Sequence, residues 1–236
     1  MKYKEKIATA ISTFLATSVA LASTEGGIQL GQSRILIEDG AKKAGYALTN
    51  HYSSPVLASG TVTNFDGSPT SVFAVSPSIY QIPAGSTAQG NIIQLQQLPQ
   101  DRESVFWLRI KTVVAEEKKN DDKNPKSVSN SGQFGISIAQ RIKIFYRPNG
   151  VNEKCAKAVE NLSWKKNKNG ITVNNKSKVS VSIVEIAEGK KVHKISDVLM
   201  PLSSATYSLN INNWERLSMK YVDEYGNFID VPIEVK

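Results

Sequence analysis

The clearest alternation of apolar and polar positions runs from Gln133 to Pro148, in QFGISIAQRIKIFYRP. Large apolar side chains at Phe134, Ile136 and Ile138 alternate with small ones, and this period of two predicts a β-strand with one apolar face. In the second half of the stretch Phe145 adds an apolar side chain to the other face, between Lys143 and Arg147, which predicts a strand partly buried on both sides. At about 3.3 Å per residue the whole stretch would span roughly 50 Å, two to three times the usual strand length. Such a strand either fills the core of its own sheet or forms an edge that another chain covers.

Short apolar runs separated by turn signals recur along the rest of the chain. Long amphipathic helical patterns are nearly absent, so we predict an all-β protein built of immunoglobulin-like sandwiches. Turns are expected at Asn174-Asn175-Lys176 and at Glu188-Gly189-Lys190. The expected strands are 28–37, 45–50, 56–62, 72–75, 79–82, 89–95 and 105–114 in the first half, and 162–164, 170–173, 179–186, 195–201, 218–222 and 228–235 in the second.

The first 22 residues have the pattern of a secretory signal peptide. Three lysines precede an apolar run from Ile7 to Ala22, and Ala20-Leu21-Ala22 matches a cleavage site. A membrane anchor is the competing interpretation, but the run is shorter than the about 20 residues that a spanning helix needs. We therefore expect an exported protein with no stable membrane anchor.

The remaining chain is long enough for two domains. Pro148-Asn149-Gly150 is a suitable linker, which predicts a first domain at 23–148 and a second at 149–236. A polar segment at 116–132, mixed in charge, is expected to be a mobile loop. Cys155 is the only cysteine, so no intramolecular disulfide can form. We expect it to be a small buried apolar side chain rather than a reactive thiol.

Composition and charge argue against several classes of function. The formal charge of +8 falls to about +6 once three lysines and one glutamate leave with the signal peptide. Nucleic-acid binding is not expected, because the basic residues are mixed with acidic ones and the chain is exported. The only histidines are His51 and His193, so no metal set is expected. Asp101 and Glu103 form a carboxylate pair without a nearby histidine, and no glycine-rich phosphate loop is present. We predict neither an enzyme nor a cofactor.

Three motifs in order resemble those of periplasmic pilus-assembly (fimbrial) chaperones of the PapD-like family. The strongest is Ile142 to Pro148, IKIFYRP, similar to the family's last strand of the N-terminal domain. The others are LPQDRESVFWLRI at 98–110 and Arg34 in IQLGQSRILI. The resemblance implies two immunoglobulin-like domains in an L-shaped arrangement, a periplasmic location, and pilus or fimbrial subunits and an outer-membrane usher as partners. The chain departs from the pattern at Arg109, where Asn or Cys is usual.

The resemblance also implies roles for individual residues. Arg34 and Lys143 would anchor the terminal carboxylate of a subunit. The apolar row of Phe134, Ile136 and Ile138 would be donated to the subunit as a missing strand, and we expect this row to share a face of the strand with Lys143. Glu103 and Glu224 would join a network between the domains. The resemblance implies a basic partner at the position of Gln81, so we expect this network to be weakened.

A secreted two-domain β-sandwich that binds carbohydrate or a surface polymer is the alternative function. It would need exposed aromatic side chains clustered on loops. Trp107, Trp164 and Trp214 are scattered along the sequence instead, which favours the chaperone hypothesis.

Overall fold

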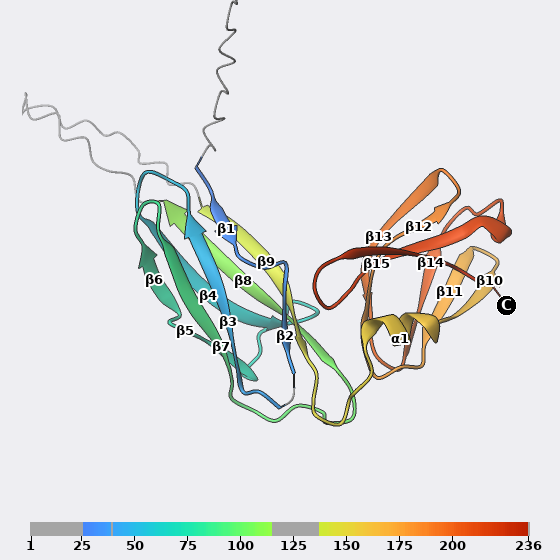
Figure 1. Ribbon diagram of the computed structural model, residues 1–236, viewed down its shortest axis with the longest axis horizontal. Helices are drawn as coiled ribbons and strands as arrows, with labels where there is room; N and C mark the ends of the chain where they lie inside the picture. Colours follow the sequence, from blue (N-terminus) through green and yellow to red (C-terminus); the bar gives the residue numbers. More distant parts are fainter. Residues whose placement is uncertain (1–25, 39, 115–136, 236) are drawn as a thin grey trace, which may run out of the picture.

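A computed structural model describes residues 26–38, 40–114 and 137–235. They form two β-sandwiches joined at one end, and the two arms meet at an angle (Figure 1). The predicted all-β fold class is confirmed. The predicted signal peptide, the polar segment at 116–132, and Phe134 and Ile136 lie outside the described residues. Within the described ranges, no helix has the length and apolar character that crossing a membrane requires.

The first sandwich packs a four-stranded sheet, ordered β1-β3-β7-β5, against a five-stranded sheet, ordered β2-β9-β8-β4-β6. Only β2 and β9 pair in parallel; the other neighbours are antiparallel. The strands are β1 (Ile28–Leu30), β2 (Arg34–Ile37), β3 (Lys43–Asn50), β4 (Val56–Asn64), β5 (Phe73–Ser76), β6 (Ile79–Ile82), β7 (Thr87–Gln94), β8 (Ser104–Val114) and β9 (Ser137–Tyr146).

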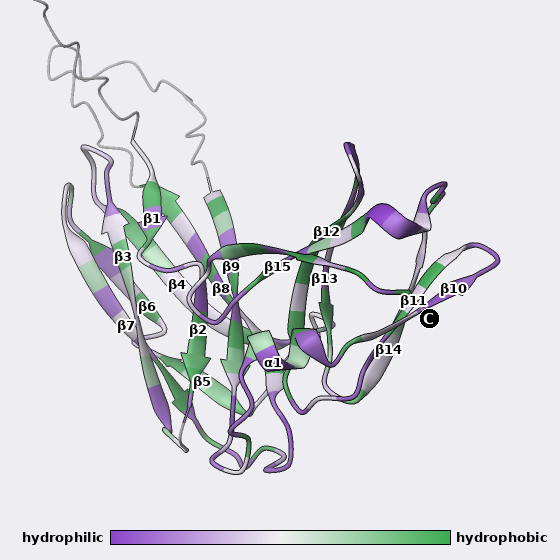
Figure 2. Cartoon of the chain, turned by 45° about the vertical axis from the view of Figure 1, so that its right-hand side comes forward, coloured by the Kyte–Doolittle hydropathy of each residue, from purple (hydrophilic) through white to green (hydrophobic). Residues whose placement is uncertain are grey.

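Strand β8 shows how alternation along the sequence builds the first core. Phe106, Leu108 and Ile110 are buried against the opposite sheet, while Trp107 and Arg109 project from the other face. Each large apolar side chain buried in this way stabilises the fold by about 1.5–3 kcal/mol. Hydrophobic residues accordingly concentrate on the strands and hydrophilic ones at the hairpin loops (Figure 2).

The strand predicted at 28–37 is wrong as a single element. The chain breaks after Leu30, and its two parts pair in different sheets: β1 with β3, and β2 with β9. The N–H of Gly31 still donates to the carbonyl of Ala47 on β3, and the crossing to the other sheet follows. Because the segment 28–37 crosses from one sheet to the other, it closes one edge of the sandwich. The continuous apolar pattern of these residues does not reveal the crossing.

The second sandwich packs a three-stranded sheet, ordered β10-β11-β14, against a four-stranded sheet, ordered β13-β12-β15-β16. Its elements are α1 (Cys155–Glu160), β10 (Ser163–Asn167), β11 (Gly170–Asn175), β12 (Val181–Glu188), β13 (Lys191–Leu199), β14 (Ser203–Ser208), the 3₁₀ turn η1 (Trp214–Arg216), β15 (Leu217–Val222) and β16 (Phe228–Pro232).

Three of these elements, α1, β14 and the three-residue η1, were not predicted from the sequence. Helix α1 has six residues, too few for a helical period to stand out. Strand β14 is SSATYS, in which only Ala205 and Tyr207 pack on the core. Serine and threonine fill its other positions, so the apolar alternation that marks a strand is weak.

The turn predicted at Asn174-Asn175-Lys176 is wrong, because Asn175 ends strand β11 and is completely buried. Its side-chain N–H groups donate to the carbonyls of Val179 (2.8 Å) and Met200 (3.0 Å). Its side-chain oxygen accepts from the N–H of Ser177 at 3.0 Å. The buried side-chain amide of Asn175 thus supplies hydrogen-bond partners to backbone groups that would otherwise be buried without one. Asn175 is therefore fixed at the end of the strand and is not part of an exposed turn. Asn50 at the end of β3 is buried and bonded to backbone carbonyls in the same way.

Cys155 begins helix α1 and is buried in the second core, with 4% of its surface exposed. Burial, and then the charge of Glu224, raise the pKa of its thiol to about 12. Because the thiolate is the reactive form, we expect Cys155 to resist iodoacetamide at neutral pH in the folded protein and to react after unfolding in urea. Labelling of the native chain at the rate of the unfolded chain would contradict this expectation.

Candidate functional site

Arg34 and Lys143 occupy directly paired positions on the parallel strands β2 and β9. The guanidinium of Arg34 reaches the second sandwich, where Nη1 donates to the carbonyls of Val222 (3.2 Å) and Asp223 (2.6 Å) in the hairpin between β15 and β16. Burial lowers the pKa of Arg34. The structure thus brings the two predicted anchor residues, far apart in the sequence, to adjacent positions at the junction of the sandwiches.

Lys143 is half-buried, and its Nζ lies 5.6 Å from the ring centroid of Trp107. Burial, and then the neighbouring charge of Arg34, lower the pKa of Lys143. In the described part of the chain, no carboxylate forms an ion pair with either cation. A carboxylate from outside the chain would relieve this repulsion and gain charge-assisted hydrogen bonds.

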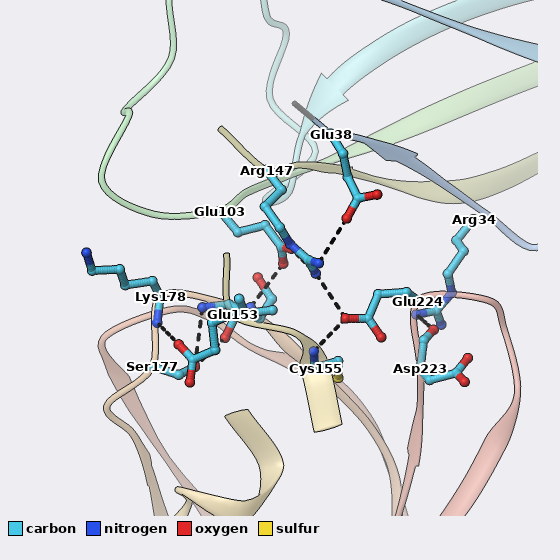
Figure 3. A network of polar contacts seen from close by, with 12 residues as sticks. Arg34, Glu38, Glu103, Arg147, Glu153, Cys155, Ser177, Lys178, Asp223 and Glu224 are labelled. Carbon is cyan, nitrogen blue, oxygen red and sulfur yellow. Dashed lines mark hydrogen bonds and ion pairs between the residues drawn. The ribbon is translucent and has the colours of Figure 1, made fainter. Parts of the chain in front are cut away.

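An ion-pair network centred on Arg147 links the two sandwiches (Figure 3). Its Nε and Nη2 donate to one oxygen of Glu103 at 3.0 and 2.9 Å. Glu38 from the first sandwich and Glu224 from the second lie at 3.1 and 3.3 Å. The side chains of Arg147 and Glu103 are 6% and 1% exposed, and the second oxygen of Glu103 accepts from the N–H of Ser180. The two carboxylates predicted for an interdomain network therefore contact the same arginine.

The assignment of the network's partner position to Gln81, with no basic residue there, is wrong. Gln81 lies on β6, at the far edge of the five-stranded sheet, where it pairs with Leu57. The partner is Arg147, which follows β9 within the same IKIFYRP run that contains Lys143. The sequence contained a signal for this role of Arg147, which directly follows a long apolar strand. A charged side chain that is buried with the end of such a strand needs a partner of opposite charge.

A small cavity of about 10 Å³ lies between Arg34 and this network. Its lining includes Ser180 and Ser182, whose hydroxyl groups have no hydrogen-bond partner within the described structure. The volume suffices for about one water molecule. This cavity is therefore too small to admit the end of another chain.

The expectation that Lys143 and the apolar row share a face is wrong. Strand β9 pairs with β8 without a bulge from Ser137 to Tyr146, so residues an odd number apart face opposite sides. Ile138 lies on the core face with Ile142, while Lys143 faces the second sandwich. Ile138 stands at the end of the sandwich, where 37% of its surface is exposed. It is the one member of the apolar row among the described residues.

One edge of β9 is open over half its length. The described part of the chain pairs β2 only with the second half of β9, from Lys143 to Tyr146. From Ser137 to Ile142 the only strand paired with β9 in that part is β8, on the opposite edge. Unpaired backbone N–H and C=O groups along such an edge can accept another strand. The open edge ends at Lys143, so an added strand would point its end at both anchor residues.

Asp101 and Glu103, considered above as a carboxylate pair, have separate roles. Asp101 is exposed and pairs with Arg102 at 3.3 Å, whereas Glu103 is buried against Arg147. Among the residues that the structure describes, no three His, Cys, Asp or Glu side chains gather as metal ligands.

The tryptophans do not form a sugar-binding surface. Trp164 is buried in the second core. Arg141 lies over the ring of Trp107, and Lys166 lies over the ring of Trp214. Because Trp164 is buried, and Trp107 and Trp214 belong to different sandwiches, the three rings do not form one platform for stacking against a sugar.

Two family models match the chain. The one described as "Pili and flagellar-assembly chaperone, PapD N-terminal domain" matches residues 27–152, and "Pili assembly chaperone PapD, C-terminal domain" matches residues 157–231. The sequence is 28% identical over 219 residues to the chaperone protein FimC of Escherichia coli (strain K12), covering 92% of this chain and 87% of FimC. It is 29% identical over 234 residues to the probable fimbrial chaperone SfmC of the same strain, covering 98% and 97%.

Solved structures show the same two-sandwich fold. The Escherichia coli chaperone DraB superposes with a TM-score of 0.73 at 19% identity, covering 89% of this chain and 97% of that one. A chain in the complex of the Salmonella enterica SafA pilin with the SafB chaperone gives a TM-score of 0.73 at 20% identity, covering 88% and 96%.

Proposed function

This chain belongs to the family of PapD-like pilus-assembly chaperones, and on that premise we propose that it captures exported pilus subunits in the periplasm and passes them to an outer-membrane usher. Residues 1–22 are the signal peptide in this proposal, 23–148 the capturing domain and 149–236 the second domain. Folding help of this kind needs no catalysis, because the binding of the subunit itself lowers the free energy of its folded state.

The observation that carries the proposal is the position of Lys143. It is a half-buried cation beside a second cation, and it forms no ion pair with a carboxylate in the described structure. It lies where the open edge of β9 ends. A chain end supplies both a free carboxylate and a strand. A subunit whose last strand lies along β9 would present its terminal carboxylate to Lys143 and Arg34.

Strand addition to the open edge of β9 is the proposed mode of capture, and it is the mode already known for chaperones and pilins as a class. Main-chain hydrogen bonds would supply affinity that does not depend on the subunit sequence. Side chains at alternate positions would add specificity. We propose Phe134, Ile136 and Ile138 as the donated apolar row, which would fill a groove in a subunit that lacks one strand.

We expect Lys143→Ala to weaken subunit capture by about ten- to hundredfold. A hydrogen bond to a charged group contributes about 1.5–3 kcal/mol, and each 1.4 kcal/mol corresponds to about a factor of ten in Kd. The measurement is co-purification of exported pilins with the tagged chain, followed by Kd for one purified subunit. Lys143 is the sharper test of the anchor, because Arg34→Ala would also remove contacts to the second sandwich.

Lys165→Ala is the matched control, since Lys165 is an exposed lysine on β10 of the other domain. It should leave capture and thermal stability unchanged. Equal Kd values for the wild type and Lys143→Ala, with both proteins folded, would contradict the proposed role of Lys143 as an anchor.

A further inference from the structure

Four cations lie on one face of the adjacent strands β8 and β9: Arg109, Lys111, Arg141 and Lys143. We call this set the basic face. Alternation along both strands directs these side chains away from the first core. Figures 1 and 2 both place β9 on the side of the first sandwich that is next to the hairpin of β15. The basic face is therefore the surface of the first domain that lies beside the proposed anchor, Arg34 and Lys143.

The centre of the basic face is a shallow hollow with two guanidinium groups. Arg109 and Arg141 are directly opposite each other across the antiparallel pair. The guanidinium carbon of Arg141 lies 4.5 Å from the ring centroid of Trp107. Together with Thr63 these side chains line a cavity of about 320 Å³. A guanidinium group held over an aromatic ring, as that of Arg141 is, suits a carboxylate, whose two oxygens can accept paired N–H bonds.

The charge of this face is not balanced within the described residues. Like charges directly opposite each other destabilise an antiparallel pair, and no described carboxylate forms an ion pair with any of the four cations. Asp66 in a nearby loop accepts from Ser68 at 2.7 Å. Asp197 on β13 accepts from Tyr207 at 3.1 Å, and its charge opposes the lowering of the pKa of Lys143 by burial, but it forms no ion pair with Lys143. An anion from a binding partner would remove the repulsion.

We propose that the basic face binds an acidic side chain on the last strand of the captured subunit, two residues before its terminal residue. This inference rests on the proposed function. Arg141 precedes Lys143 by two residues, about 6.6 Å along the strand, on the same face. Paired residues of neighbouring strands project to the same side of a sheet. A subunit strand that ends at Lys143 therefore places one side chain beside Arg141, and the hollow makes a carboxylate the preferred group there.

The consequence is selectivity among subunits. A chain whose last strand carries Asp or Glu at this position would bind more tightly than one with a neutral residue. Arg109 stands where the resemblance implies Asn or Cys, so the doubled arginine is a property of this chain rather than of the family pattern. Electrostatic attraction of this kind also speeds encounter, and it weakens as salt is added.

The test uses short synthetic peptides of alternating valine and threonine, with one variable residue. Glutamate or glutamine stands two residues before the terminal residue, and each peptide is made with a free carboxyl end and with an amide end. A further peptide carries glutamate one position nearer the end, where its side chain faces the other side. Fluorescence anisotropy gives Kd for the wild type, Arg141→Gln, Arg109→Gln and the control Lys165→Gln.

We expect glutamate at the predicted position to lower Kd about three- to tenfold relative to glutamine in the wild type. The gain should disappear in Arg141→Gln, shrink in Arg109→Gln and persist in Lys165→Gln. An equal gain from the neighbouring position, or a gain that survives Arg141→Gln, would overturn the inference and leave capture by the anchor intact. Loss of binding on amidation tests the anchor separately. If no peptide binds the wild type, the result contradicts both the proposed function and this inference.

Discussion

Replacing Arg147 by alanine is expected to lower the free energy of unfolding by about 3–5 kcal/mol, because a buried charge loses its partner. The side chain of Glu103 is 1% exposed and accepts two of its hydrogen bonds from Arg147. Urea denaturation followed by tryptophan fluorescence measures the change. Arg102→Ala is the matched control, since Arg102 pairs with Asp101 at the surface, and it should cost less than about 0.5 kcal/mol.

The destabilisation by Arg147→Ala should shrink as the pH falls. Burial raises the pKa of Glu103 and Arg147 opposes the rise, so the folded variant has a higher pKa at Glu103 than the wild type. The carboxyl of the unfolded chain keeps a pKa of about 4.3. Between these two values the folded variant binds a proton that the unfolded chain does not, so its stability rises as the pH falls through the folded pKa.

Two comparisons make this prediction testable. The difference between the wild type and Arg147→Ala should be smaller at about pH 5 than at about pH 8. A double variant, Arg147→Met with Glu103→Met, should recover much of the loss, because apolar replacement of a whole buried pair is often neutral. An equal loss at both pH values together with no recovery in the double variant would mean that the network is not the source of the effect.

Changing Ile138 to aspartate is expected to weaken subunit binding by at least about a hundredfold. An isoleucine that fills a groove in the subunit contributes about 1.5–3 kcal/mol, and an aspartate there would instead be a buried carboxylate without a partner, at a cost of several kcal/mol. In the free protein 37% of the surface of Ile138 is exposed at the end of the sandwich, so the carboxylate can remain in water. The melting temperature should therefore fall by only a few degrees.

Ser137→Asp is the control for this experiment. It adds the same charge at the neighbouring position, where the side chain is exposed on the opposite face. Its effect on Kd should be much smaller than that of Ile138→Asp. The reverse result, normal subunit binding with a melting temperature lowered by many degrees in Ile138→Asp, would show that Ile138 belongs to the chaperone's own core.

Properties that depend on neighbours along the chain could be predicted. Alternation of large and small side chains identifies β9 as a strand, and the turn at Glu188-Gly189-Lys190 falls where Gly189 adopts a φ of 60°. The same alternation already contains the correct faces of β9, because Ile138 and Lys143 are five positions apart, an odd number. The expectation that Lys143 shares a face with Ile138 was therefore wrong, although the sequence alone was sufficient to reject it.

Properties that depend on which strands become neighbours required the tertiary structure. The split of 28–37 between two sheets, the choice of Arg147 rather than Gln81 as the centre of the network, and the opposition of Arg109 to Arg141 are all of this kind. Each arises from pairing between segments that lie far apart in the sequence.

The sequence by itself therefore determined most of the strands, the two-sandwich class and, through the family motifs, Arg34 and Lys143 as candidates for the proposed anchor. The tertiary structure decided that these two cations stand side by side, that an open edge of β9 ends at them, and that a second pair of cations flanks that edge. The physical reason is that side-chain alternation is a local consequence of extended backbone, whereas strand order and register follow from the packing of two whole sheets around one core.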